Sequence, residues 1–148
     1  MTCFLQVARY GRFMRTRRRR SDCPVHFGLE TFGDQWSLLI IRDLMFKGRT
    51  TYTDFLRAEE AIATNVLADR LLRLEEDRII ESNPAPRSGY RLTAKGADLL
   101  PVMLEIIRWS AAHDPGTAAD AAFVERVRTD RAGLEAELRQ TLTTGAAG

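Results

Sequence analysis

The chain has 148 residues, 45% of them hydrophobic, so it is long enough for one domain with a modest core and too apolar to be disordered. Its apolar runs fall short of the roughly 20 residues that cross a bilayer, and the N-terminus lacks the apolar segment of a signal peptide. These features predict a cytoplasmic protein without membrane contact. Two cysteines and two histidines in separate regions make a metal site or a disulfide framework unexpected, and we expect no cofactor.

Positive charge is concentrated at the N-terminus. Residues 1–20 hold seven arginines and no acidic residue, whereas residues 21–148 hold 15 basic and 20 acidic side chains, a net charge of −5. We interpret residues 1–21 as a basic, flexible arm, because blocks of like charge stay extended and attract phosphate. A solvated tail is the alternative, and Met14 is a second candidate for the first residue. The arginines that we assign to DNA are Arg15, Arg17, Arg18, Arg19 and Arg20.

The first helix is predicted over residues 24–32. The sequence Asp22-Cys23-Pro24 offers a capping residue and a proline at its start, and Gly33 ends it. Its apolar stripe consists of Val25, Phe27 and Leu29.

Two more helices are predicted before residue 59. Asp34 can cap a helix over residues 36–46, whose apolar residues recur with the 3.6-residue period. A connector at residues 49–51 then leads to a brief helix over residues 52–58. The side chains that we expect to point inward from this brief helix are Tyr52, Phe55 and Leu56.

The stretch TNVLADRLLRLEED, residues 64–77, predicts a fourth helix after a turn at residues 59–61. Leu67, Leu71 and Leu74 form its core stripe, with Ala63 beside them. The opposite face carries Asn65, Asp69, Leu72 and Glu76.

Two short strands are predicted next, at residues 78–82 and 89–92, around a tight Pro/Gly connection tipped by Arg87. Helix, turn, helix and hairpin is the element order of the winged helix-turn-helix. The predicted fold class is therefore mainly α with a small β-hairpin wing. In this fold the second helix of the pair enters the DNA major groove, and the wing can reach phosphates or the minor groove.

Several motifs at matching spacings resemble one known family, the HxlR-type transcriptional regulators, winged-helix proteins related to the MarR group. The resemblance covers residues 22–112 and implies a dimeric bacterial DNA-binding regulator with residues 64–77 as its recognition helix. Relatives carry a glycine where this chain has Ala61. The motifs are Cys23-Pro24, Gly33-Asp34-Gln35-Trp36 followed by LLII, Tyr52-Thr53-Asp54-Phe55, Ile62 with TNVLADRL, and PRSGYRLTAKG.

The recognition helix and the wing supply the expected contacts with double-stranded DNA. Asn65 can pair with adenine through two hydrogen bonds, while Ala68 and Leu72 can rest on thymine methyl groups. The i,i+4 spacing predicts that Asp69 orients Arg73. Arg70 can either contact a phosphate or form an intramolecular ion pair, and the sequence leaves both roles open. The full set is Thr64, Asn65, Ala68, Asp69, Arg70, Leu72 and Arg73 in the helix, with Arg87 and Ser88 in the wing.

The chain beyond the wing predicts dimerisation. Residues 93–113 form a helix capped by Thr93, with Pro101 as a kink or break, and its sequence is apolar nearly all the way round. A second subunit is the expected cover, so that a homodimer formed through the terminal helices binds an inverted-repeat operator. The alternative is an ordinary intramolecular core.

A last helix is predicted over residues 118–143, with Gly133 as its weak point. The chain thus divides into the arm at residues 1–21, the winged-helix domain at residues 22–113, and a C-terminal helical extension with a disordered tail at residues 114–148. The apolar stripe of the last helix consists of Phe123, Val127, Leu134, Leu138 and Leu142.

Cys23 is the candidate redox residue. A helix N-terminus and the nearby arginines both favour a thiolate at this position. Some HxlR-type relatives sense oxidants through a cysteine at the matching position, and Cys3 is a candidate partner for it. The alternative is a small buried residue beside a proline.

No catalytic constellation stands out in the sequence, so we expect no enzymatic activity. The predicted function is a dimeric, sequence-specific DNA-binding transcriptional regulator, either repressor or activator. The alternative is a winged-helix module for protein contacts without specific DNA readout, which the acidic charge of residues 21–148 keeps open. The sequence does not indicate whether the protein binds a small-molecule effector.

Overall fold

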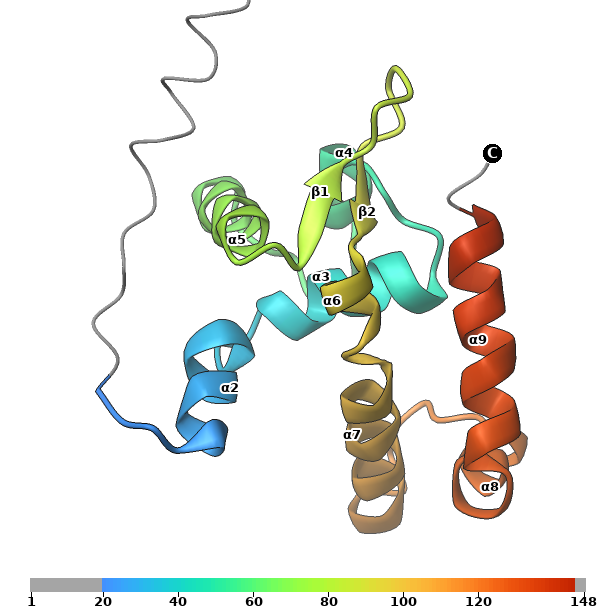
Figure 1. Cartoon of the computed structure of the whole chain (residues 1–148). Helices are drawn as coiled ribbons and strands as arrows, with labels where there is room; N and C mark the ends of the chain where they lie inside the picture. The colour runs from blue at the N-terminus through green and yellow to red at the C-terminus, as the bar shows by residue number, and fades with distance from the viewer. Residues whose placement is uncertain (1–19, 146–148) are drawn as a thin grey trace, which may run out of the picture.

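A computed structural model describes residues 20–145 (Figure 1). The fold is a winged helix-turn-helix, mainly α with one two-stranded antiparallel hairpin, as the element order predicts. Within the described part of the chain, no helix is both long and apolar enough to span a bilayer. The elements are α2 (Pro24–Phe32), α3 (Ser37–Phe46), α4 (Tyr52–Leu56), α5 (Thr64–Glu76), β1 (Ile80–Ser82), β2 (Tyr90–Leu92), α6 (Ala94–Ala97), α7 (Leu100–His113), α8 (Ala121–Thr129) and α9 (Arg131–Gly145).

Asp34 binds the backbone at the start of α3, but the helix begins at Ser37 and its N-cap residue is Trp36, not Asp34. Its Oδ1 accepts hydrogen bonds from the backbone N–H groups of Trp36 (2.8 Å) and Ser37 (2.9 Å). Burial raises the pKa of Asp34, but the hydrogen bonds from Ser37 and Trp36 and the charge of Arg70 lower it more, to below its ordinary value. The carboxylate is therefore held ionised at the start of α3.

A capping box starts α4. Thr51 Oγ1 accepts from the Asp54 N–H (3.1 Å), and Asp54 Oδ2 accepts from the Thr51 N–H (3.0 Å). Hydrogen bonds from the N–H groups of Thr51 and Thr50 lower the pKa of Asp54. The helix ends at Leu56 instead of residue 58, and the inward orientation predicted for Tyr52 is wrong, because its side chain is 37% exposed.

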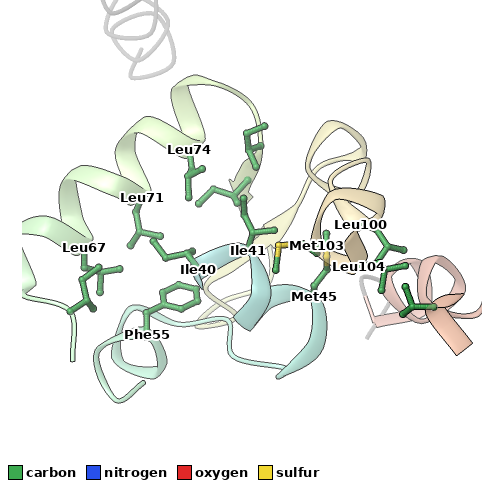
Figure 2. Close-up of a cluster of buried hydrophobic side chains, with 14 of the residues drawn as sticks. Ile40, Ile41, Met45, Phe55, Leu67, Leu71, Leu74, Leu100, Met103 and Leu104 are labelled. Carbon is green, nitrogen blue, oxygen red and sulfur yellow. The ribbon is translucent and has the colours of Figure 1, made fainter. Parts of the chain in front are cut away.

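One apolar core joins α3, α4, α5, α7, α8 and α9 (Figure 2). Leu67, Leu71 and Leu74 of α5 are all buried and face Ile40 of α3 and Phe55 of α4, which confirms the predicted stripe. Burying one such leucine contributes about 1.5–3 kcal/mol to stability. Ala63 does not lie beside this stripe. It is the exposed N-cap residue of α5, since the helix begins only at Thr64.

The hairpin is shorter than predicted. Ile80 pairs with Leu92 and Ser82 pairs with Tyr90, so that the strands span residues 80–82 and 90–92. Arg78 has a φ of 57°, which is not extended, and this delays the start of β1. The wing therefore begins directly after a tight turn that follows α5.

Residues 93–113 do not form one helix. Thr93 Oγ1 accepts from the Gly96 N–H (3.1 Å), which confirms the predicted cap, but α6 ends at Ala97 and α7 begins at Leu100. Pro101 lies in the first turn of α7, where a proline is tolerated because its missing N–H would have no intrahelical partner. The predicted break thus falls just before the proline.

The prediction of a single last helix over residues 118–143 is wrong, because two helices, α8 and α9, occupy this region. The break is at Asp130, whose φ of −140° and ψ of 50° are not helical. Its Oδ1 accepts from the Gly133 N–H (3.2 Å), so Asp130 ends α8 and caps α9, and Gly133 is not the weak point. The apolar stripe did not reveal this break, because its helical period continues on both sides of Asp130.

The C-terminal extension packs against the winged-helix domain. Val127 of α8 and Leu134 of α9 are buried in the same cluster as Leu104 of α7. Ion pairs add to this contact, from Arg131 to Glu105 (2.6 Å) and from Arg139 to Asp98 (3.1 Å). Hydrogen bonds from Arg108 and Arg131 lower the pKa of Glu105 to about 2. The extension therefore covers part of the apolar surface of α7 that we assigned to a second subunit.

Candidate nucleic-acid interface

The outer face of α5 carries the predicted DNA contacts. Thr64, Asn65, Ala68, Asp69, Leu72 and Arg73 are all exposed on this face, whereas the leucines on the opposite side are buried. Leu72 is 52% exposed, a high value for a leucine in the middle of a helix. Figure 1 shows α5 beside the hairpin, with the wing loop projecting from the body of the molecule. The helix thus presents one continuous surface of the size that enters a major groove.

Charged residues on α5 pair with each other and with α3. Asp69 Oδ2 lies 3.1 Å from Arg73 Nε, the i,i+4 pair that the spacing predicts. Arg70 points back toward the start of α3, where its Nη1 is 3.5 Å from Asp34 Oδ2. Its Nη2 is also 3.6 Å from Asp69 Oδ2. Arg70 therefore forms the intramolecular ion pair that was one of its two predicted roles. Its contact with DNA remains a prediction.

A group of charged side chains holds the turn before α5 against α3, and the sequence analysis missed it. Asp43 is 2% exposed and pairs with Arg42 (2.8 Å) and with Arg49 (3.4 Å). Arg42 also reaches Glu60 (3.1 Å), and Arg49 reaches Glu59 (2.9 Å). An aspartate inside the apolar run of α3 was the signal, because a buried carboxylate needs charged partners.

The turn itself contains a strained residue. Ala61 has a φ of 55°, a conformation that glycine adopts readily and that costs other residues roughly 1–2 kcal/mol. This position is the one at which the family resemblance described above implies a glycine. The group around Asp43 stabilises the turn in spite of this strain, and so it contributes to where α5 begins.

The wing places its two predicted residues differently. Arg87 is exposed in the wing loop and has a φ of 61°. Ser88 is half-buried, and its N–H donates to the Ala85 carbonyl (3.2 Å). Of the two, Arg87 is the better placed to reach a phosphate.

The arm lies almost entirely outside the described residues. This applies to Arg15, Arg17, Arg18 and Arg19, and also to Cys3. Arg20 is described and is exposed. DNA contact by all five arginines therefore remains a prediction.

Cys23 is the N-cap residue of α2, and its side chain is exposed as a free thiol. The alternative role, as a small buried residue beside the proline, is therefore wrong. Its N–H donates to Ser21 Oγ (3.1 Å). Within residues 20–145, no group of three or more His, Cys, Asp or Glu residues is arranged to hold a metal ion.

Apolar side chains are exposed on α2 and α7. No residue of α2 is buried, and Val25 and Leu29 are 67% and 60% exposed. On α7, Ile106 is 42% exposed and Trp109 is 59% exposed. The ring centroids of Trp109 and His113 are 4.8 Å apart. Ile106 and Trp109 are the part of the predicted dimer surface on α7 that stays exposed beside the C-terminal extension, whereas the exposed stripe of α2 was not part of that prediction.

Comparisons with known proteins match the part of the chain that contains the helix-turn-helix and the wing. Residues 31–117 match the family model for the HxlR-like helix-turn-helix. An uncharacterised HTH-type transcriptional regulator from Synechocystis, sll1512, is 34% identical over 86 residues, which are 55% of this chain and 63% of that protein. The HTH-type transcriptional regulator YodB from Bacillus subtilis is 31% identical over 93 residues, which are 60% of this chain and 82% of YodB.

Two solved structures are also similar. The crystal structure of PA1607, a candidate transcription factor, superposes with a TM-score of 0.59 at 36% identity, covering 67% of this chain and 72% of PA1607. The reduced form of YodB superposes with a TM-score of 0.53 at 30% identity, covering 66% of this chain and all of that chain (100%). Both α8 and α9 lie beyond the residues that match the family model.

Proposed function

Since the chain belongs to the HxlR-like helix-turn-helix family, we propose that it is a homodimeric, sequence-specific DNA-binding transcriptional regulator that acts in the cytoplasm. One observation supports this most strongly. The outer face of α5 exposes Asn65, Ala68 and Leu72 together, while the opposite face is anchored in the core. A recognition helix needs this arrangement, because its readout face must be free and its position must be rigid. Two such helices in a two-fold dimer read half-sites about one helical turn apart, so the operator is an inverted repeat.

The chemistry of this face fits base readout in the major groove. The amide of Asn65 accepts from the N6 amino group of adenine and donates to its N7, and Ala68 and Leu72 contact thymine methyl groups. Asp69 holds Arg73 through their ion pair and keeps its guanidinium on the DNA-facing side. Phosphate contacts come from Arg87 in the wing and from the arm, and they fix the register of the protein on the duplex.

Asn65→Ala tests the proposal. Because one bidentate pair discriminates by about 1–3 kcal/mol, we expect this loss of binding free energy on the preferred duplex and relaxed preference at one base pair per half-site. The preferred duplex is first selected from a random pool, and affinities for it and for random DNA are then measured at fixed salt. Gln140→Ala is the matched control, since it removes an exposed amide from α9.

Two results would contradict this role of Asn65. Equal weakening on preferred and random DNA would mean that Asn65 contacts only the backbone. Unchanged affinity on both would mean that α5 does not read DNA through this residue.

We further propose that Cys23 makes DNA binding sensitive to oxidants. The thiol is exposed at the start of α2, and one relative, YodB, has a structure described as its reduced form. A peroxide would oxidise the Cys23 thiolate to sulfenic acid and would itself be reduced, releasing hydroxide. In Cys23→Ser, most of the peroxide-induced change in DNA affinity should disappear, as measured by titration before and after treatment. Cys3→Ser is a second variant that tests whether Cys3 is the partner of Cys23, and an unchanged peroxide response in Cys23→Ser would contradict the proposal.

A second candidate function is a winged-helix module that binds proteins without specific DNA readout. The net charge of −5 on residues 21–148 favours it, because an acidic surface repels phosphate. The dependence of duplex binding on salt separates the two. A regulator loses affinity with a slope of about −0.9 in log K against log salt for each neutralised phosphate, whereas an accessory module shows no such binding.

A further inference from the structure

A hydrogen bond joins the two helices of the helix-turn-helix at the end where base readout is proposed. Tyr52 is the first residue of α4, and its hydroxyl donates to the carbonyl oxygen of Thr64 at 3.1 Å. Thr64 is the first residue of α5, and it is followed directly by Asn65. The tyrosine ring is 37% exposed, so it lies at the surface beside the readout face and not in the core.

This end of α5 has few other polar contacts. Its N-cap residue, Ala63, has no side chain that could accept a hydrogen bond from the first turn. The residue two positions earlier, Ala61, has the positive φ described above. Within residues 20–145, no side chain other than Tyr52 hydrogen-bonds the main chain of residues 61–66. The buried side chains of Ile62 and Leu67 pack the start of α5 against the core. The hydroxyl of Tyr52 adds a directional hydrogen bond to this packing.

The segment that carries Tyr52 is itself fixed to the wing. The N–H of Tyr90, at the start of β2, donates to the carbonyl of Thr50 (2.8 Å). A Cβ on Gly89, which has a φ of 72°, would lie 2.1 Å from the same carbonyl oxygen, so only glycine allows this close approach. Asp54 accepts from the N–H of Thr50 (3.0 Å) and so connects it to α4. A series of hydrogen bonds therefore runs from the wing through α4 to the start of α5.

We infer that Tyr52 is a positioning residue for sequence readout, whose hydroxyl sets the first turn of α5 so that Asn65 meets a base edge at hydrogen-bonding distance. The inference rests on the proposed function. Bidentate pairing with a base requires donor–acceptor distances of about 2.7–3.2 Å, so a small shift of the first turn weakens it. Contacts with phosphate through flexible arginines tolerate the same shift. Loss of the hydroxyl therefore affects specific binding and leaves non-specific binding unchanged.

Tyr52→Phe removes the hydroxyl and keeps the ring. Because one hydrogen bond contributes about 0.5–1.5 kcal/mol, affinity for the preferred duplex should fall about two- to thirteenfold, with no change on random DNA or in its salt slope. Tyr90→Phe is the matched control, since it removes a hydroxyl from a neighbouring ring, 6.3 Å from Phe55, and leaves the bond to Thr64 intact. Thermal unfolding of each variant shows whether the fold itself has changed.

The double variant Tyr52→Phe with Asn65→Ala identifies the mechanism. If Tyr52 acts by positioning Asn65, the hydroxyl should have little further effect once the amide is gone, so the two losses should not add. Additive losses, or equal weakening of Tyr52→Phe on preferred and random duplexes, would overturn the inference and would indicate a direct contact with DNA. If Asn65→Ala weakens specific binding and Tyr52→Phe does not, the inference fails and the proposed function stands. If Asn65→Ala has no effect, the inference fails together with the readout role proposed for Asn65.

Discussion

Replacing Trp109 by glutamate is expected to convert the protein from a dimer to monomers. Trp109 is 59% exposed on α7, beside Ile106, and we propose that the partner subunit covers both. A buried tryptophan at an interface contributes at least about 2 kcal/mol, and a two-fold dimer contains the substitution twice. The free energy of dimer association should therefore weaken by about 4 kcal/mol. This raises the dimer dissociation constant roughly a thousandfold, as measured by sedimentation equilibrium.

DNA binding provides the second measurement on this variant. A monomer contacts one half-site only, so its affinity for the inverted repeat should approach its affinity for a single half-site. Ala136→Glu is the control, because Ala136 is exposed on α9, outside its apolar stripe. A wild-type protein that sediments as a monomer, or a Trp109→Glu variant that remains dimeric, would contradict the proposed dimer.

Neutralising the arm is expected to lower affinity for every duplex alike. The variant replaces Arg15, Arg17, Arg18, Arg19 and Arg20 by glutamine. If all five contact phosphate, the slope of log K against log salt should become shallower by up to about 4.5 units for each protomer, because each contact contributes about 0.9. Sequence preference should not change, since phosphates carry no base information. The effect is large because the rest of the chain, residues 21–148, has a net charge of −5.

Two controls calibrate the effect of the arm. A chain that begins at Met14 keeps all five arginines and should bind like the full chain. Arg87→Ala removes one exposed charge from the wing and should change the slope by about one unit or less for each protomer. An unchanged slope in the five-arginine variant would mean that the arm does not contact DNA.

The local elements of this fold could be predicted because their signals lie within a few residues of each other. Asp34 and Thr93 were identified as caps, and both accept backbone hydrogen bonds from residues two or three positions ahead. The leucine stripe of α5 follows from its period alone, and its exposed face follows from the same period. The winged helix-turn-helix and its candidate readout face were therefore accessible from the sequence.

The limits of α8 and α9 could not be predicted in this way. Their apolar residues keep one continuous period across Asp130, and Val127 of α8 and Leu134 of α9 are both buried in the one core cluster. Only the backbone angles of one residue separate them. A break of this kind leaves no trace in a hydrophobic pattern, and an aspartate is too common on helix surfaces to mark it.

The sequence by itself determined the order of elements as far as the wing, the polar residues Asp34 and Thr93 at two helix starts, and the composition of the candidate readout face. The tertiary structure decided which distant residues meet: Asp34 with Arg70, Asp43 with Arg42 and Arg49, and the Tyr52 hydroxyl with the carbonyl of Thr64. The physical reason is that periodicity and capping act over one or two helical turns, whereas these polar contacts depend on how whole helices pack. The direction in which α5 presents Asn65 therefore belongs to the tertiary structure.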